Sequence, residues 1–270
     1  KAAFQFGWDW APRQLAGEIS FPICLTFEDE KEYLRFASVQ TEAISEEVAN
    51  MLLTIKTEFL KDEKYNLKLA YSTSDNKITT LDLGELKLEN LKDNLYLFRF
   101  NVENPQLWFP NGYGDPTLYE ATIYLYNKKS ICLDSVKTRF GIRTIELSQK
   151  KDKYGSEFCF IVNGKPIFAK GANLVPSAMH KERYEGMAKH IDLVKECNMN
   201  MLRVWGGGYY VDEQMYKACD EKGILIWQDF PFACALYPAT KDYLAEVETE
   251  ARQNVLRISS HPSLAVWCGN

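Results

Sequence analysis

Polar and aromatic side chains gather at the ends of two short apolar runs in the second half of the sequence. Arg203 and Trp205 end the run MNMLRVW, and Gln228 and Asp229 end the run ILIWQD. Runs this short and apolar are typical of strands buried on both faces of a parallel sheet. The carboxyl ends of parallel strands form one edge, and α/β enzymes place their chemistry there. We therefore expect a ligand site at this edge.

The residues between the two runs predict a helix. Three glycines at 206–208 free the backbone after the first strand, and Asp212 is a typical helix-capping residue. Lys222 and Gly223 are typical of a helix end. Between these ends, apolar residues recur at close to helical spacing: Val211, Met215, Tyr216 and Cys219. Strand, helix and strand in this order predict a βαβ unit and a parallel sheet.

Composition narrows the classes of ligand. The net charge of −5 over 270 residues gives no electrostatic reason to expect nucleic acid or an acidic membrane as partner. No signal peptide or membrane-spanning run is visible. Aromatic residues make up 13% of the chain. That content fits either a large β-rich core or a sugar-binding cleft, because aromatic faces stack on the apolar faces of sugar rings. Cellular localisation and oligomeric state stay open.

The cysteines and histidines do not predict a metal site. The seven Cys lack CxxC and Cys/His spacing, and their odd number favours buried free thiols over a disulfide framework. The three His, at 180, 190 and 261, are scattered along the chain. We expect no metal and no organic cofactor.

The pattern of the chain changes twice. Residues 31–146 hold several short runs rich in β-branched and aromatic residues, separated by turn signals, which predicts an immunoglobulin-like β-sandwich. Residues 147–155 form a polar linker. Residues 156–270 then predict a hairpin at Asn163-Gly164, a buried strand at 166–173, and alternating helices and strands up to 264–270.

Two stretches between and before these regions carry further signals. The loop 104–116 is dense in Pro, Gly and aromatic residues, which fits a domain contact or a cleft wall. The chain begins at Lys1 and stops after a fourth strand of the α/β pattern, so we expect it to be a piece of a longer protein. Near the start, Asp9 stands between Trp8 and Trp10. Such an aspartate either caps a turn in a core or is presented to a ligand by a loop.

Several long motifs occur in an order that resembles one family closely. They are GWDWAP, NPQLWFPNGYGDP, RTIEL, VNGKPIFAKGAN, RVWGGGYYVDEQMYKACDEKGILIWQDFPFACALYP and SHPSLAVWCGN. Together they resemble the β-mannosidases of glycoside hydrolase family 2, the group that also holds β-galactosidase and β-glucuronidase. The resemblance implies that 1–30 is the tail of a jelly-roll sugar-binding domain. It further implies that 31–146 is an immunoglobulin-like sandwich and 156–270 the first half of a TIM (β/α)₈ barrel.

The resemblance also implies an activity for the parent protein. It is a retaining exo-β-mannosidase that removes terminal β-mannose from oligosaccharides or glycoproteins, using two glutamates about 5 Å apart. Both glutamates are expected beyond Asn270, so no catalytic residue is assigned within the chain, and the segment alone is expected to be inactive. Another exo-β-glycosidase of this fold, an exo-β-glucosaminidase or β-galactosidase, is the nearest alternative. A non-catalytic carbohydrate-binding product is a third.

The resemblance finally assigns binding residues. Arg203 is expected to hold the nucleophile ionised and oriented, or else to form an ion pair inside the barrel. Asp229 lines the pocket or accepts a hydrogen bond from a loop amide, and Asn270 contacts sugar or simply follows the strand in a turn. The residues predicted to bind substrate are Asp9, Trp10, Trp205, Asp229 and Asn270.

Overall fold

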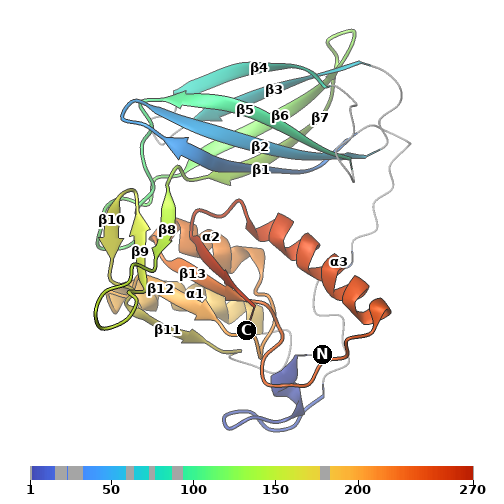
Figure 1. Cartoon of the computed structure of the whole chain (residues 1–270). Coiled ribbons are helices and arrows are strands. Elements are labelled where there is room, and N and C mark those ends of the chain that lie inside the picture. The colour runs from blue at the N-terminus through green and yellow to red at the C-terminus, as the bar shows by residue number, and fades with distance from the viewer. Residues whose placement is uncertain are drawn as a thin grey trace. The chain divides into compact units, whose positions relative to one another are not determined.

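The structure is a computed structural model that describes residues 2–15, 23, 33–58, 64–72, 77–86, 94–176 and 183–269 (Figure 1). The chain divides into two compact units. The sandwich unit comprises Cys24–Trp108 and Thr117–Thr144. The parallel-sheet unit comprises Lys1–Ile23, Phe109–Pro116 and Ile145–Asn270.

The sandwich unit consists of two antiparallel sheets, with strand orders β1-β2-β5 and β4-β3-β6-β7. Buried residues alternate with more exposed ones along β2, β3 and β6, as expected of strands with one face on a core. The inward residues of both sheets form a single hydrophobic cluster. The strands are β1 Tyr33–Ile44, β2 Val48–Glu58, β3 Tyr65–Ser72, β4 Ile78–Leu86, β5 Leu95–Glu103, β6 Tyr119–Asn127 and β7 Cys132–Phe140. The predicted strand-rich region is therefore confirmed, whereas its immunoglobulin type stays a prediction.

The parallel-sheet unit contains the predicted hairpin. Strands β8 (Ile145–Ser148), β9 (Cys159–Val162) and β10 (Lys165–Ile167) form a small antiparallel sheet. Asn163 and Gly164, between β9 and β10, have φ values of 50° and 74°. Asn-Gly tolerates two successive positive φ angles, which a tight hairpin turn needs.

The prediction of a single strand at 166–173 was wrong. The structure has two strands there, β10 and the parallel strand β11 (Gly171–Leu174). Asn200 interrupts the run, since its side chain accepts a hydrogen bond from the Lys170 N–H and donates one to the Phe168 carbonyl. A Cβ at Gly171 would lie 1.7 Å from the Met201 carbonyl oxygen, so the close approach at the start of β11 requires glycine. Strand β11 was also expected to be buried, but it is mostly exposed at the edge of its sheet.

The main sheet of this unit is parallel, in the order β11-β12-β13-β14. Strands β12 (Met201–Val204), β13 (Leu225–Asp229) and β14 (Leu264–Cys268) alternate with helices α1 (Arg183–Glu196), α2 (Glu213–Lys222) and α3 (Lys241–Ile258). The predicted alternation of strands and helices is confirmed. Alternate strand residues, including Leu202, Val204 and Ile226, pack against helix residues in one hydrophobic cluster.

Helix α2 begins and ends as its sequence predicts. The Asp212 side chain accepts a hydrogen bond of 2.9 Å from the Met215 N–H at the first turn. Gly223 follows the last turn with a left-handed φ of 72°. A Cβ at Gly223 would also lie 2.7 Å from the Asn111 backbone nitrogen, so both conformation and space favour glycine.

The loop Phe109–Pro116 clusters with the parallel-sheet unit. The Asn111 N–H donates to the Gly223 carbonyl at 2.7 Å, and its side-chain amide donates to the Met199 carbonyl at 2.9 Å. Met199 and Gly223 precede β12 and β13. This loop therefore braces the N-terminal ends of those strands, at the edge opposite to Asp229.

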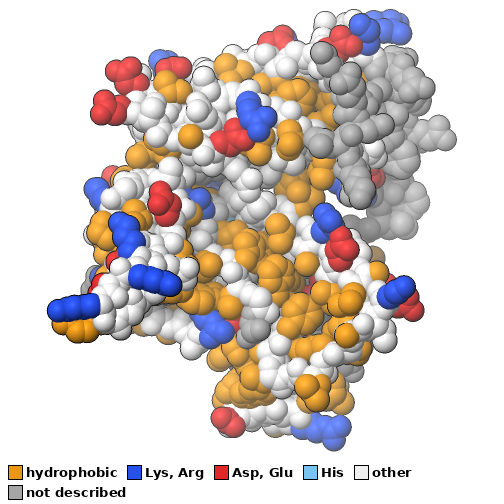
Figure 2. Space-filling view, in the orientation of Figure 1, with side chains coloured by type: hydrophobic (Ala, Val, Ile, Leu, Met, Phe, Trp, Pro, Cys, Tyr) orange, Lys and Arg blue, Asp and Glu red, His pale blue; other side chains and the backbone are white. Residues whose placement is uncertain are grey.

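Helix α3 is exposed near its start and becomes buried toward its end. Ile258 is fully buried, whereas Leu244 is 53% exposed. Figure 2 shows hydrophobic side chains gathered over the region of α3 and β14. None of the helices within the described ranges is long and apolar enough to cross a membrane.

The prediction that the cysteines are buried free thiols is confirmed only in part. Six cysteines lie in the part of the chain that the structure describes, and all six are free thiols. Cys219 is buried as expected, whereas Cys132, Cys197 and Cys234 are exposed, because they lie in turns or on solvent-facing positions and not in the core.

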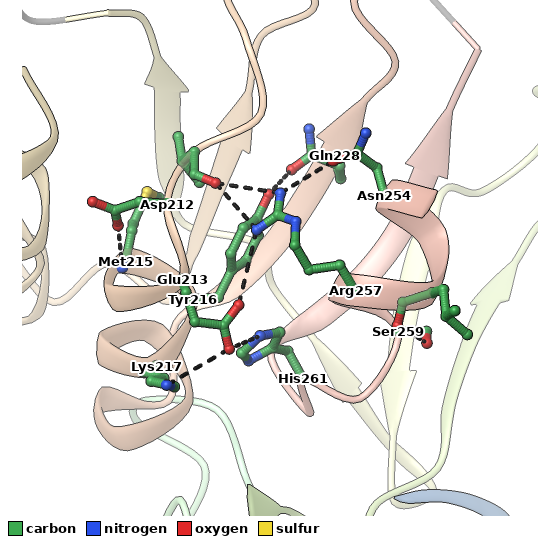
Figure 3. Close-up of polar contacts among 12 residues, drawn as sticks. Asp212, Glu213, Met215, Tyr216, Lys217, Gln228, Asn254, Arg257, Ser259 and His261 are labelled. Carbon is green, nitrogen blue, oxygen red and sulfur yellow. Dashed lines mark hydrogen bonds and ion pairs between the residues drawn. The ribbon is translucent and has the colours of Figure 1, made fainter. Parts of the chain in front are cut away.

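A polar cluster ties α2 to the turn between α3 and β14 (Figure 3). The His261 Nδ1 lies 2.6 Å from Asp220 Oδ2, and its Nε2 lies 3.3 Å from Glu213 Oε1. The ring stacks on Tyr216 with a centroid separation of 5.2 Å. Both carboxylates belong to α2, so one histidine holds the helix at two points.

Candidate functional site

The strand-end residues divide between the two faces of the parallel sheet. Gln228 is buried toward the helices, where its Oε1 accepts a hydrogen bond of 2.6 Å from the Tyr216 hydroxyl of α2. Asp229, the next residue, points to the other face because side chains alternate along a strand. Arg203 of β12 lies on that same face, and the two meet there.

Arg203 and Asp229 form a two-pronged ion pair. Arg203 donates from Nε to Asp229 Oδ1 at 3.1 Å and from Nη2 to Oδ2 at 2.6 Å. The Asp229 side chain is fully buried, whereas that of Arg203 is 33% exposed. Arg203 Nη1 donates to Asn173 Oδ1 at 3.3 Å. Paired hydrogen bonds of this kind fix the plane of a guanidinium as well as its position.

The observed contacts match the alternatives stated for both residues. Arg203 has an ion-pair partner, and Asp229 also accepts a hydrogen bond of 3.1 Å from the Gly206 loop amide. Contact of Asp229 with a sugar and orientation of a nucleophile by Arg203 stay predictions.

The loop after β12 holds Trp205 against its own backbone. A Cβ at Gly207 would lie 2.0 Å from the Trp205 ring. A side chain at 207 therefore cannot coexist with this position of the indole. At Gly208 the nearest neighbours of a Cβ are Pro176 ring atoms at 3.1 and 3.2 Å, which is far less restrictive.

The N-terminal segment packs on the Trp205 loop. The Phe4 N–H donates to the Gly207 carbonyl at 3.1 Å. Trp8 and Ala11 exchange backbone hydrogen bonds of 2.9 and 3.2 Å, so residues 9 and 10 form the tip of a tight turn. This segment was expected to reach the same site as Trp205, and the structure brings the two together.

Aromatic contacts order the tip of the turn around Trp205. Trp8 and Trp10 approach its ring edge-to-face, with centroids at 5.0 and 6.0 Å. Trp10 also stacks on Phe4 at 5.4 Å and remains 41% exposed. Asp9 is exposed between them. Together, Trp8, Asp9, Trp10 and Trp205 are called the tryptophan wall below.

Two hollows lie on the face of the sheet that carries Arg203. The smaller, of about 220 Å³, is bordered by Arg203, Asn173 and Gly171. The larger, of about 590 Å³, is lined by aromatic residues of the hairpin region and by Trp227, on which Phe158 stacks at 5.5 Å. Arg203 borders the smaller hollow only, and no residue of the tryptophan wall lines either of the two.

Other predicted features lie outside this geometry. Asn270 falls outside the described residues, so its contact with substrate stays a prediction. Among the residues that the structure describes, no three His, Cys, Asp or Glu side chains group as metal ligands.

Sequence reasoning missed three contributors to the site: Asn173, Gly206 and Phe4. Asn173 pairs in register with Arg203 across the parallel strands. Counting back from each strand end would have found it, because both residues lie one position before the end. Gly206 acts through its amide, and Phe4 through a long-range backbone contact, which no residue type signals.

Comparison with known proteins finds similarity to glycoside hydrolases. Residues 33–143 match the model of the family described as glycosyl hydrolases family 2. Over its whole length the chain is 37% identical to beta-mannosidase B of Aspergillus fumigatus and 36% identical to that of Emericella nidulans. It spans 31% of the length of each of these relatives.

Solved structures agree with the sequence comparison. A beta-D-mannosidase from Dictyoglomus thermophilum matches the whole chain with a TM-score of 0.84 and 34% identity, over 33% of its own length. A beta-glucuronidase from Bacteroides uniformis matches 88% of the chain, over 28% of its own length, with a TM-score of 0.70 and 23% identity. The second likeness concerns the fold alone.

Proposed function

Because the chain belongs to the family 2 glycosyl hydrolases, as its motifs predicted, we propose that it supplies the sugar-binding part of an exo-β-mannosidase. The proposed substrate is the terminal, non-reducing β-mannose of an oligosaccharide or glycoprotein. Identity to beta-mannosidases over the entire chain supports this substrate over other glycosides.

The observation that carries the proposal is the tryptophan wall, in which Trp205 follows Arg203 by two residues. Aromatic faces contact the apolar faces of a sugar ring, and Asp9, on the exposed tip of the turn, can accept hydrogen bonds from sugar hydroxyls. The wall combines residues from the N-terminus with one from the end of β12. We assign Asp9, Trp10 and Trp205 to direct substrate contact, and Asn270 by resemblance.

The proposed architecture follows the same kinship. Residues 156–270 are the first half of a TIM (β/α)₈ barrel, 31–146 an immunoglobulin-like sandwich, and 1–30 the tail of a jelly-roll domain. The parallel order β11-β12-β13-β14 with intervening helices supports the barrel assignment. The packing of Phe4 on Gly207 supports a jelly-roll tail that reaches the mouth of the barrel.

We propose a retaining mechanism whose two glutamates lie outside this chain. Asp229 is unsuited to either role, because its carboxylate is fully buried and already accepts three hydrogen bonds. In this mechanism one carboxylic acid protonates the glycosidic oxygen and the other carboxylate attacks the anomeric carbon. Arg203, whose side chain is one-third exposed, orients the attacking carboxylate and keeps it ionised.

A substrate panel tests this function. The full-length protein is assayed with the 4-nitrophenyl β-glycosides of mannose, glucosamine and galactose, and kcat/KM is expected to be highest for the mannoside. Preference for the glucosaminide or galactoside would replace mannosidase by a sibling activity. The isolated 270-residue chain serves as a control and should hydrolyse none of the three. Sugar binding without hydrolysis by the full-length protein would favour a carbohydrate-binding product.

A further inference from the structure

The Asp229 carboxylate accepts three hydrogen bonds, all from groups of its own chain. Its Oδ1 accepts from Arg203 Nε at 3.1 Å, and its Oδ2 accepts both from Arg203 Nη2 at 2.6 Å and from the Gly206 N–H at 3.1 Å. The side chain has no exposed surface. A sugar hydroxyl could reach this carboxylate only by displacing Arg203 or Gly206.

The two residues that donate to Asp229, Arg203 and Gly206, lie in different parts of the site. Arg203 presents its remaining exposed edge toward the hollow that it borders with Asn173. Gly206 is the first residue after Trp205, at the start of the loop that shapes the tryptophan wall. One buried carboxylate thus joins the cation of the site to the loop that carries its aromatic wall.

We propose that Asp229 is a positioning residue that sets Arg203 and the Trp205 loop at the same time, and that it does not contact the substrate. This inference rests on the proposed function for its effect on rate, but its geometric part stands by itself. Asp229 would give the guanidinium one orientation out of the many that a flexible arginine can adopt.

Loss of this restraint should affect the chemical step. A misplacement of about 1 Å at a reacting group can cost roughly 10²-fold in rate. In the full-length protein, Asp229→Asn is therefore expected to lower kcat for the β-mannoside by roughly 10²-fold, with a smaller change in KM. A displaced Arg203 would also stabilise the nucleophilic carboxylate less, so the acid limb of the pH profile of kcat/KM should move to higher pH.

A double-mutant cycle separates positioning from direct sugar contact. If Asp229 acts through Arg203, the variant Arg203→Lys removes most of what Asp229 contributes, and adding Asp229→Asn costs little more. If Asp229 binds a sugar hydroxyl independently, the two losses multiply. Multiplied losses, or an Asp229→Asn variant that raises KM with kcat and the acid limb unchanged, would overturn the proposal.

Asp220→Asn is the matched control. Asp220 is also a buried aspartate of the parallel-sheet unit, but it holds His261 and a turn amide away from Arg203. This variant should lower stability while the folded protein keeps its kcat and acid limb. A similar loss of kcat in both variants would mean that any buried carboxylate matters equally, which contradicts the inference.

A crystal structure of the full-length variant gives a readout independent of activity. In Asp229→Asn, both the Arg203 guanidinium and the Trp205 loop should shift, whereas in Asp220→Asn neither should. If Asp229→Asn does not fold, Asp229→Glu keeps the charge but moves it, and the same two shifts are expected. Unmoved Arg203 and Trp205 would refute the positioning role, whichever glycoside the protein cleaves.

Discussion

Replacing His261 is expected to abolish a pH-dependent contribution to stability. Its imidazole is buried, stacks on Tyr216 and lies between the carboxylates of Asp220 and Glu213. Burial lowers the pKa of His261, but the hydrogen bonds and charges of the two carboxylates outweigh burial and raise that pKa to about 9. The folded protein therefore keeps this histidine charged at neutral pH.

The raised pKa sets the sign and size of the effect. An unfolded histidine has a pKa of about 6.5, so tighter proton binding in the fold stabilises it by about 3 kcal/mol. Because the folded pKa is the higher one, this contribution is complete below pH 6.5 and is lost as the pH rises through about 9. Burial raises the pKa of Glu213, but the contact with His261 and the charges of Lys217 and Arg257 together outweigh it and lower that pKa. The stability from Glu213 is therefore lost on the acid side.

Urea unfolding between pH 6 and 10, followed by tryptophan fluorescence, measures the effect. The wild-type midpoint should fall by about 1 M across this range, given slopes of a few kcal/mol per M. The variant His261→Asn should be less stable at pH 6, and the difference from wild type should shrink toward pH 10. Exposed His190 on α1 provides the matched control, His190→Asn, which should follow wild type. A difference between wild type and His261→Asn that stays constant with pH would refute the reasoning.

Three further perturbations test local features. Gly207→Ala places a Cβ 2.0 Å from the Trp205 ring, so tryptophan fluorescence should shift, whereas Gly208→Ala should leave it nearly unchanged. Asp212→Ala removes the cap of α2 and should lower the free energy of unfolding by about 1 kcal/mol, with Asp212→Asn as the control that keeps an acceptor. The isolated chain should bind a hydrophobic dye, less so with Leu244→Glu on α3, and a dye-free monomer with a cooperative melt would contradict this.

Local signals in the sequence were sufficient for helix α2 and for the turn between β9 and β10. Asp212 and Gly223 mark the two ends of α2 because capping depends on neighbouring backbone groups within one turn. The Asn163-Gly164 turn is equally local, since it needs only two residues that tolerate positive φ. The edge of the sheet that carries Arg203 and Asp229 also followed from the strand order.

Contacts between residues that lie far apart in the sequence could not be predicted from it. The break between β10 and β11 depends on Asn200. Its side-chain amide bonds to the backbone of Lys170 and Phe168, which are 30 and 32 residues away in the sequence. The pairing of Arg203 with Asp229 depends on which strands are neighbours and on their register. Sequence therefore did not identify the ion-pair partner of Arg203, and the structure shows that it is Asp229.

The same limit applies to the tryptophan wall. Motif resemblance suggested that Asp9 and Trp205 serve one site, but spacing along the chain carries no such information. The edge-to-face contacts of Trp8 and Trp10 with Trp205 occur together with the backbone hydrogen bond from Phe4 to Gly207. This bond joins two segments through main-chain atoms only, so every residue type except proline could donate it at position 4.

The kinetics of the Asp9→Asn variant test the central claim most directly. Asp9 lies on the exposed tip of a turn, so the substitution should leave the stability of the full-length protein unchanged. If the tryptophan wall holds the terminal mannose, kcat/KM for 4-nitrophenyl β-mannoside should fall at least roughly tenfold, the loss of about one good hydrogen bond to a charged group. An unchanged kcat/KM for the mannoside, in a variant as stable as wild type, would contradict the account.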